Sequence, residues 1–245
     1  MKISEQNVRP RSRNSTRSLL IAAMTTVALI GADAAGAVAL VVRSSGPSSP
    51  NYRPGKALPE NARVALRPGD VVVVLASDST HTFHGPGTFA LAGGSDSLPS
   101  MMAGRRGRFS ELRTAGIVPK SPTIWHVDVT QSGKVCLADP KNVMLWRPDA
   151  RQAATLSVTG GGADGSTAQW PAGQSTLAWP DGVPIVAGTE YQLRMAPTAA
   201  PVKLTFETLP VMPTDLTSVA KALIDQHCET QLDLLIATVP TAPAG

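Results

Sequence analysis

The chain has 245 residues, of which 16% are charged and 4% are aromatic, and it contains 21 glycines and 21 prolines. So few charges and so many turn residues argue against a coiled coil, a long helical bundle and an acidic disordered tail. The net charge of +4 lies wholly within residues 1–17, and the rest of the chain is neutral, which removes the electrostatic argument for nucleic-acid binding.

Residues 1–42 have the pattern of an export signal. A basic stretch up to Arg17 precedes the apolar segment 19–30, and small residues follow it. This order is typical of a secretory signal peptide, which we expect to be cleaved after Ala34 or Ala37. The basic end stays in the cytoplasm, so the remainder of the chain is expected in the periplasm.

An uncleaved membrane anchor is the alternative for the same segment. Residues 19–42 are long enough to span a bilayer as a helix, although Asp33 lies among them. In that case the protein is held in the inner membrane, and residues 19–42 are its only contact with the bilayer. Residues 43–60, which are rich in Ser, Pro and Gly, are predicted to form a flexible linker.

Residues 61–118 are predicted to form a small β-module followed by a basic loop. The turn RPGD at 67–70 precedes a continuous apolar run, and two further short strands follow as a meander. The predicted strands are Val71–Leu75, Thr80–Phe83 and Thr88–Leu91. The loop carries a basic cluster that could contact anionic glycan or lipid headgroups, or could be a solvated linker: Arg105, Arg106 and Arg108.

The first strands of this module resemble a known family. The sequence Leu66-Arg67-Pro68-Gly69-Asp70, followed by a turn, a short strand, Gly-Pro-Gly-Thr-Phe and another strand up to Leu91, is similar to the periplasmic FecR-type domain. The resemblance covers about thirty residues and consists mainly of turn chemistry. It implies a β-fold in the periplasm that senses a protein partner.

Residues 119–210 are predicted to form an antiparallel β-sandwich of six or seven strands. Apolar residues alternate with polar ones along several of them, which indicates one buried and one wet face. The segment 177–195, LAWPDGVPIVAGTEYQLRM, resembles the strand–loop–strand of a fibronectin-III or immunoglobulin-like module. The candidates are Thr123–Val129, Lys134–Ala138, Val143–Trp146, Ala154–Val158, Ser175–Trp179, Tyr191–Met195 and Val202–Glu207, and residues 160–165 are expected to be a loop.

Residues 211–239 change to helical periodicity and are predicted to form two helices that lie on the sandwich, before a frayed tail at 240–245. The chain has two cysteines, both in the part expected to be exported, where oxidation is the default. We therefore predict a disulfide between Cys136 and Cys228, with two buried free thiols as the alternative.

Catalytic patterns are weak. His81 and His84 are spaced three apart on a strand, so they point to opposite faces and predict no metal site. His126 and Asp128 share one face and could orient a general base, but a satisfied polar pair is the preferred interpretation because no nucleophile motif accompanies them. We therefore predict no enzyme activity, no cofactor and no metal.

Two classes of function remain. The first is a non-catalytic envelope protein that acts through protein–protein contact in signalling or scaffolding. The second is a glycan- or peptidoglycan-binding module, which would use the arginine loop and the similar turns at Trp170 and Trp179 if those rings are exposed on one face. The alternative for these tryptophans is that they plug the ends of the sandwich.

Overall fold

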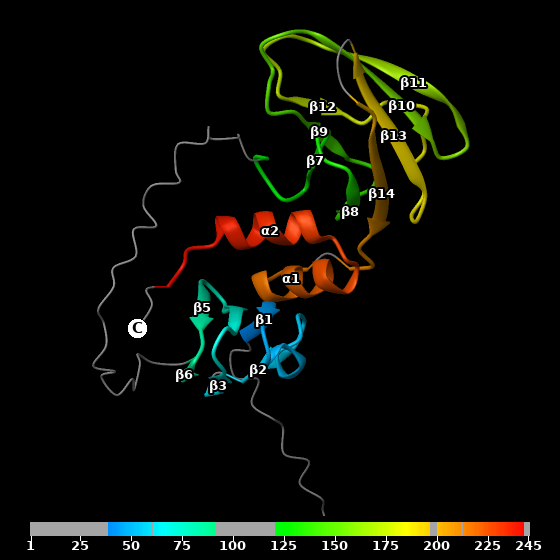
Figure 1. The fold of residues 1–245 in the computed structure, drawn as a ribbon. Coiled ribbons are helices and arrows are strands. Elements are labelled where there is room, and N and C mark those ends of the chain that lie inside the picture. Colours follow the sequence, from blue (N-terminus) through cyan, green and yellow to red (C-terminus); the bar gives the residue numbers. More distant parts are fainter. Residues whose placement is uncertain (1–38, 60, 92–120, 197–199, 212, 243–245) are drawn as a thin grey trace, which may run out of the picture. The chain divides into compact units, whose positions relative to one another are not determined.

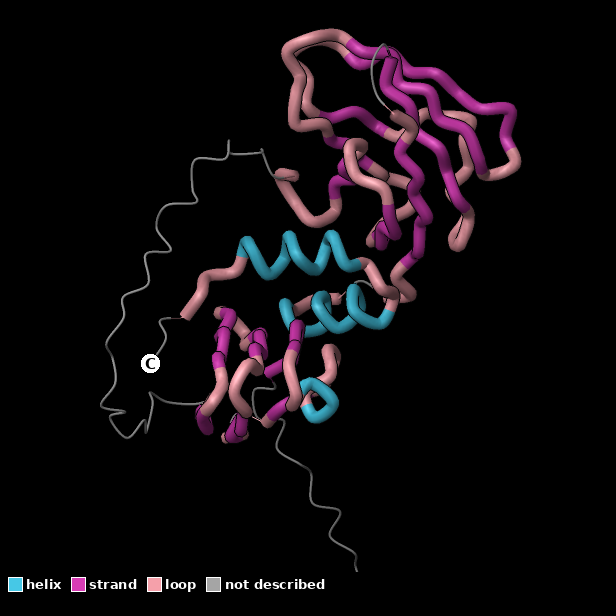
Figure 2. Tube along the Cα trace, in the orientation of Figure 1, coloured by secondary structure: helices cyan, strands magenta, loops and turns pink. Residues whose placement is uncertain are grey.

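The computed structural model describes residues 39–59, 61–91, 121–196, 200–211 and 213–242. These residues are mainly β-structure, as predicted, with two helices near the C-terminal end (Figures 1 and 2). Residues 1–38 of the predicted export signal and the arginines of the predicted basic loop lie outside the described residues. Among the described residues, no helix is both long and apolar enough to cross a bilayer.

The N-terminal β-module contains two antiparallel sheets. One has the order β2-β1-β4-β5, and the other is the pair β3-β6, so β6 leaves the meander and pairs with β3 rather than with β5. A cluster of buried aliphatic side chains joins the two sheets. The strands are β1 (Ala39–Ser45), β2 (Ala57–Leu58), β3 (Arg63–Leu66), β4 (Val71–Leu75), β5 (Thr80–His84) and β6 (Gly87–Ala90).

The predicted boundaries at 1–42 and 43–60 are wrong. Residues 39–42 belong to β1, which pairs with β4, and Val41 and Val42 are fully buried. The expected linker is ordered: it turns at Gly46, forms a short 3-10 helix at Ser49–Asn51 and returns as β2. The first error arises because β1 is buried on two faces, so its apolar run continues the apolar composition of the predicted export signal. The second arises because the Ser, Pro and Gly residues that predict a linker instead form turns and the 3-10 helix.

The second part is a β-sandwich of eight strands around one core. Its sheets have the orders β11-β10-β13-β14-β8 and β12-β9-β7, and the pairs β14·β8 and β7·β9 are parallel, unlike the expected antiparallel arrangement. Part of the expected loop at 160–165 belongs to a strand. The strands are β7 (His126–Asp128), β8 (Gly133–Leu137), β9 (Met144–Trp146), β10 (Ala154–Gly160), β11 (Ala163–Trp170), β12 (Thr176–Ala178), β13 (Glu190–Ala196) and β14 (Val202–Thr208).

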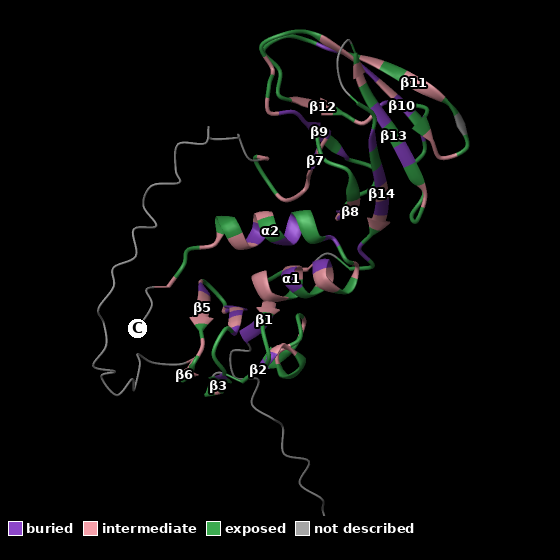
Figure 3. Cartoon of the chain, in the orientation of Figure 1, coloured by how far each residue is buried: buried purple, intermediate pink, exposed green. Residues whose placement is uncertain are grey.

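The alternation read from the sequence places the sandwich core correctly. Along β13, Tyr191 and Leu193 are buried while their neighbours are exposed, and β14 follows the same pattern (Figure 3). The Tyr191 hydroxyl donates to the carbonyl of Pro184 at 2.7 Å and accepts from the Val186 amide at 2.8 Å. This pair of bonds anchors the loop before β13 to the start of that strand.

The two predicted helices are α1 (Leu216–Asp225) and α2 (Glu229–Thr238). They form a third core that includes Leu40 of β1 and Leu75 of β4, so they pack on the N-terminal module as well as on the sandwich. The predicted disulfide is confirmed: Cys136 on β8 and Cys228 at the start of α2 are bonded, with 5.9 Å between their Cα atoms. The tail is less frayed than expected, since residues 240–242 pair with Thr80 of β5.

Candidate functional site

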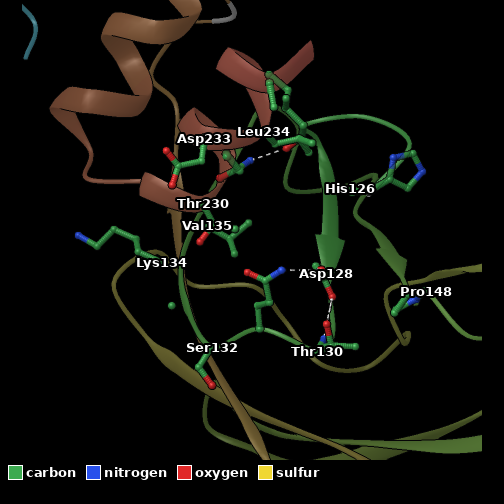
Figure 4. Close-up of a pocket in the computed structure, with 16 residues that line it drawn as sticks. His126, Asp128, Thr130, Ser132, Lys134, Val135, Pro148, Thr230, Asp233 and Leu234 are labelled. Atoms are coloured by element: carbon green, nitrogen blue, oxygen red, sulfur yellow. Dashed lines mark hydrogen bonds between the residues drawn. The ribbon is translucent and has the colours of Figure 1, made fainter. Parts of the chain in front are cut away.

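A hollow lined by both polar and apolar side chains lies along one open side of the sandwich. There β7 and β8, consecutive in the chain, diverge as edge strands of opposite sheets, and α2 closes one end. We call this cavity of about 390 Å³ the β7–β8 groove (Figure 4). Its lining includes Ile124, His126, Asp128, Gln131, Lys134, Val135, Thr230, Gln231, Asp233 and Leu234.

Gln231 of α2 covers the β8 edge at Cys136. Its Oε1 accepts from the Cys136 amide at 2.6 Å, and its Nε2 donates to the Cys136 carbonyl at 2.9 Å. The same Nε2 donates to the Ile124 carbonyl at 2.7 Å, and the side chain is buried. One side-chain amide therefore occupies the place that a neighbouring strand would take at Cys136.

Farther along the same edge, Lys134 has no such partner. The groups of Cys136 that bond Gln231 face away from β14, and residues two apart along a strand face the same way. The amide and carbonyl of Lys134 therefore also face the groove. Among the described residues, no hydrogen bond joins either group to another strand, because β8 is the edge of its sheet.

The opposite wall carries the candidate acid–base residues His126 and Asp128, whose hydrogen-bond partners in the described residues are other side chains and amides rather than each other. His126 Nδ1 lies 2.7 Å from Thr123 Oγ1. The Asp128 carboxylate accepts from the amide and hydroxyl of Thr130, at 2.8 and 2.6 Å, and from Gln131 Nε2 at 3.1 Å. Asp128 thus shapes its own turn, and Figure 4 shows the two side chains separated along the wall.

The charges around the groove are unequally neutralised. Lys134 pairs with Glu207 at 3.2 Å, and Asp233 pairs with Arg43 of β1. Asp128, by contrast, takes part in no ion pair of the described residues, and all its hydrogen bonds come from neutral groups. The β7 wall therefore presents a negative charge that no cation of the described residues neutralises.

The hypothesis that the tryptophans bind a glycan is wrong for Trp170 and stays a prediction for Trp179. Trp170 is fully buried, with the Arg147 guanidinium 4.9 Å above its ring, so it cannot stack on a sugar and plugs the sandwich. Arg147, which the sequence did not single out, is itself buried and donates to the carbonyls of Gln174 and Pro171. Trp179 is half-buried, donates from Nε1 to the Val183 carbonyl at 2.8 Å and packs edge-on against Tyr191.

The remaining candidate site residues are the strand histidine His81 and the arginines of the predicted basic loop. His81 stacks on Phe83, and no group of three or more potential metal ligands occurs in the described ranges. The three loop arginines proposed for ligand binding, Arg105, Arg106 and Arg108, lie outside those ranges.

Asp70, the acidic residue of the turn motif at 66–70, is a structural anchor. It is almost fully buried and accepts from the amides of Ser48 and Arg67. Burial acts to raise the pKa of this carboxyl, but the hydrogen bonds from Ser48 and Arg67 outweigh burial and hold the pKa below its ordinary value. The motif thus fixes two turns of the module rather than a binding site.

Sequence reasoning missed the two residues that define the groove, Gln231 and Lys134. A glutamine in the first turns of an amphipathic helix and a lysine in a short strand are common, so neither carries a signal in the sequence. Comparison of the chain with family models, curated proteins and solved structures found no match.

Proposed function

We propose that this chain is an exported, non-catalytic envelope protein that works by contact with another protein, and that the partner binds in the β7–β8 groove. The observation that carries the proposal is the backbone of Lys134, which bonds to no other strand of the described residues on its groove side and lies beside a cavity of about 390 Å³. An unpaired strand edge is a template for another chain, and a cavity within the range of about 300–1,000 Å³ can hold a ligand group.

The proposed architecture is a FecR-like module joined to an immunoglobulin-like sandwich. Strands β4, β5 and β6 fall where the FecR-like motif implies strands. The hydroxyl of Tyr191 at the start of β13 bonds back to Pro184, as the corner tyrosine of immunoglobulin-like sandwiches does. Both likenesses support a module that presents edges and loops to other proteins, which is how such sandwiches commonly act.

Export is the second part of the proposal. With residues 39–42 in β1, an anchoring helix would be confined to residues 19–38, where seven Leu, Ile and Val side chains, at about 0.3–0.6 kcal/mol each, face a cost of about 2.5–3.5 kcal/mol for Asp33. Both cleavage sites precede β1 and leave it whole. The disulfide fits an oxidising compartment. We therefore infer cleavage and a periplasmic location.

Mass spectrometry of the protein recovered from cells tests export and cleavage. We expect the mature chain to begin at Ala35 or Val38. A recovered chain that retains Met1, or one that is found only in the cytoplasmic fraction, contradicts this part of the proposal.

Site-directed photo-crosslinking in cells tests the binding site. A photo-reactive amino acid at Thr230, an exposed groove residue of α2, is expected to give a discrete crosslink to another protein. The control is the same photo-reactive amino acid at Thr167, an exposed threonine of β11. This strand is the edge opposite β8 in the five-stranded sheet. Absence of a crosslink from Thr230, or equal crosslinks from both positions, would overturn the groove as the binding site.

A glycan is the second candidate ligand. It rests on Trp179 alone, which lines a hollow of about 520 Å³ together with Asp181 and Asn142. Soluble peptidoglycan fragments should then quench tryptophan fluorescence, and the Trp179→Phe variant should lose the response. If the fragments leave the fluorescence unchanged, this second candidate is excluded.

A further inference from the structure

The edge of β8 is prepared for hydrogen bonding to an amide. At Cys136 the edge already accepts one, because the Gln231 side chain donates and accepts there as a strand backbone would. At Lys134, two residues earlier, the same pair of backbone groups faces the groove without a partner strand. A peptide backbone can therefore continue the sheet from Lys134 until it reaches Gln231, which ends the available edge.

The groove beside this edge accommodates a side chain. Ile124 before β7, Val135 of β8 and Leu234 of α2 supply apolar lining to the groove. In a strand added to β8, successive side chains point to opposite faces of the sheet. Every second residue of the added strand would consequently point between the sheets, so one apolar side chain would enter the cavity.

The negative charge of Asp128 on the β7 wall favours a basic side chain beside the apolar one in the bound segment. Asp128 lies on the wall opposite Lys134 in Figure 4, where the Lys134 side chain points away from it, and it is the groove carboxylate without an ion pair in the described residues. A neutral or acidic segment would leave this carboxylate unpaired beside a buried interface, which is unfavourable. A Lys or Arg side chain would neutralise it.

We propose that the partner enters the β7–β8 groove as an extended peptide segment. Its backbone adds a strand to β8 at Lys134, one apolar side chain fills the cavity, and a Lys or Arg side chain pairs with Asp128. This inference rests on the proposed function and adds the mode of binding and the chemistry of the bound segment. Recognition through a sheet edge suits a partner with a short unstructured segment, because main-chain bonds supply affinity and alternate side chains supply specificity.

The test uses nine-residue peptides displayed on phage and selected on the protein purified as cells produce it. We expect enriched peptides that combine an aliphatic residue with Lys or Arg. A selected peptide should bind at least tenfold more weakly to Lys134→Pro, which removes the groove-facing N–H without touching the ladder to β14. Lys134→Ala, which removes the same side chain but keeps that N–H, is the matched control and should bind the peptide at least tenfold more tightly than Lys134→Pro does.

Asp128→Asn tests the charge separately, because its amide oxygen can still accept from Thr130 while the negative charge is lost. We expect severalfold weaker binding, and a weaker dependence of binding on salt than in the unmodified protein. If the Lys134→Pro variant does not fold, hydrogen exchange of the Lys134 amide in the unmodified protein tests strand addition instead. Addition of the peptide should slow that exchange.

The outcomes separate the two proposals. Peptide binding that is equal in Lys134→Pro and Lys134→Ala, together with unchanged exchange at Lys134, overturns strand addition even where Thr230 crosslinks to a partner. Failure to enrich any peptide, or self-association of the chain through the groove, also overturns it. Absence of a crosslink from Thr230 overturns the groove as the binding site and so contradicts the proposed function itself.

Discussion

At the scale of single residues, Gln231 shows how one polar side chain completes a sheet. Its amide satisfies the buried N–H and C=O of Cys136 and the half-buried carbonyl of Ile124. Buried backbone groups without a partner are costly, so this one residue fixes how α2 sits against β8. Gln231 also marks where the free part of the β8 edge ends, and Lys134 lies within that free part.

Gln231→Ala is expected to lower the free energy of unfolding by about 2–4 kcal/mol, because it leaves several buried backbone groups unpaired. The measurement is urea unfolding at neutral pH. Gln192→Ala on the exposed face of β13 is the matched control and should change stability by less than about 0.5 kcal/mol. Equal effects of the two variants would contradict the role given to Gln231.

Gly46 and Gly69 form a second residue-scale comparison around Asp70. Both have positive φ, at 97° and 83°, but a Cβ on Gly46 would lie 2.7 Å from the Asp70 Cα, whereas a Cβ on Gly69 meets nothing within 4 Å. Gly69→Ala should therefore cost about 1–2 kcal/mol, from backbone conformation alone. Gly46→Ala should cost clearly more in the same urea experiment, and a smaller cost would refute the close approach of the two turns.

At the scale of elements, β1 shows why the N-terminal boundary was misplaced. A strand buried on both faces has no alternation of polar and apolar residues, so Ala39–Val42 reads as a continuation of the apolar export segment. Pairing with β4 is a long-range event that no local pattern reports. In contrast, β13 and β14 have one wet face and were located from their alternation to within two residues at each end.

Helix α1 carries a pH-dependent cap. Asp215 accepts from the Ser218 hydroxyl and amide and from the Thr217 hydroxyl, and these bonds, led by that from the Ser218 side chain, lower the pKa of Asp215 to about 2. Because the folded pKa lies below that of the unfolded chain, the stabilisation is present above about pH 4 and is lost as pH falls through about 2.

Asp215→Asn tests this cap, because asparagine is also a good N-cap but does not titrate. We expect the two proteins to differ little at pH 2. From pH 2 to pH 5 the unmodified protein should gain more thermal stability than the variant. Parallel stability profiles across that interval would show that Asp215 contributes nothing to the acid sensitivity.

At the scale of the whole molecule, the described parts are held together by the core around α1 and α2. This core takes side chains from β1 and β4 of the first module and from β8 of the sandwich, and the Cys136–Cys228 disulfide lies within it. Arg43 of β1 adds ion pairs to Glu229 and Asp233 of α2. Although strand composition suggests two independent modules, the helices make them share one core.

The double variant Cys136→Ala/Cys228→Ala is expected to lose about 4–5 kcal/mol of unfolding free energy, because the disulfide closes a span of 92 residues and restricts the unfolded chain. Reduction of the unmodified protein should reproduce the loss, and reductant should leave the double variant unchanged. Two reactive thiols per chain in the unfolded, unreduced protein would contradict the bond.

The sequence by itself was sufficient to predict the β-rich class, most strand positions in the sandwich, the two C-terminal helices and the pairing of the two cysteines. These features follow from local periodicity, turn chemistry and an even cysteine count, all of which are written in neighbouring residues. The candidate site was not predictable in this way. The groove exists because β7 and β8 join different sheets and because Gln231, 95 residues from Cys136, reaches the β8 edge. Which backbone groups stay unpaired at a sheet edge is decided only when distant strands and helices have packed, so only the tertiary structure determined where the candidate site lies.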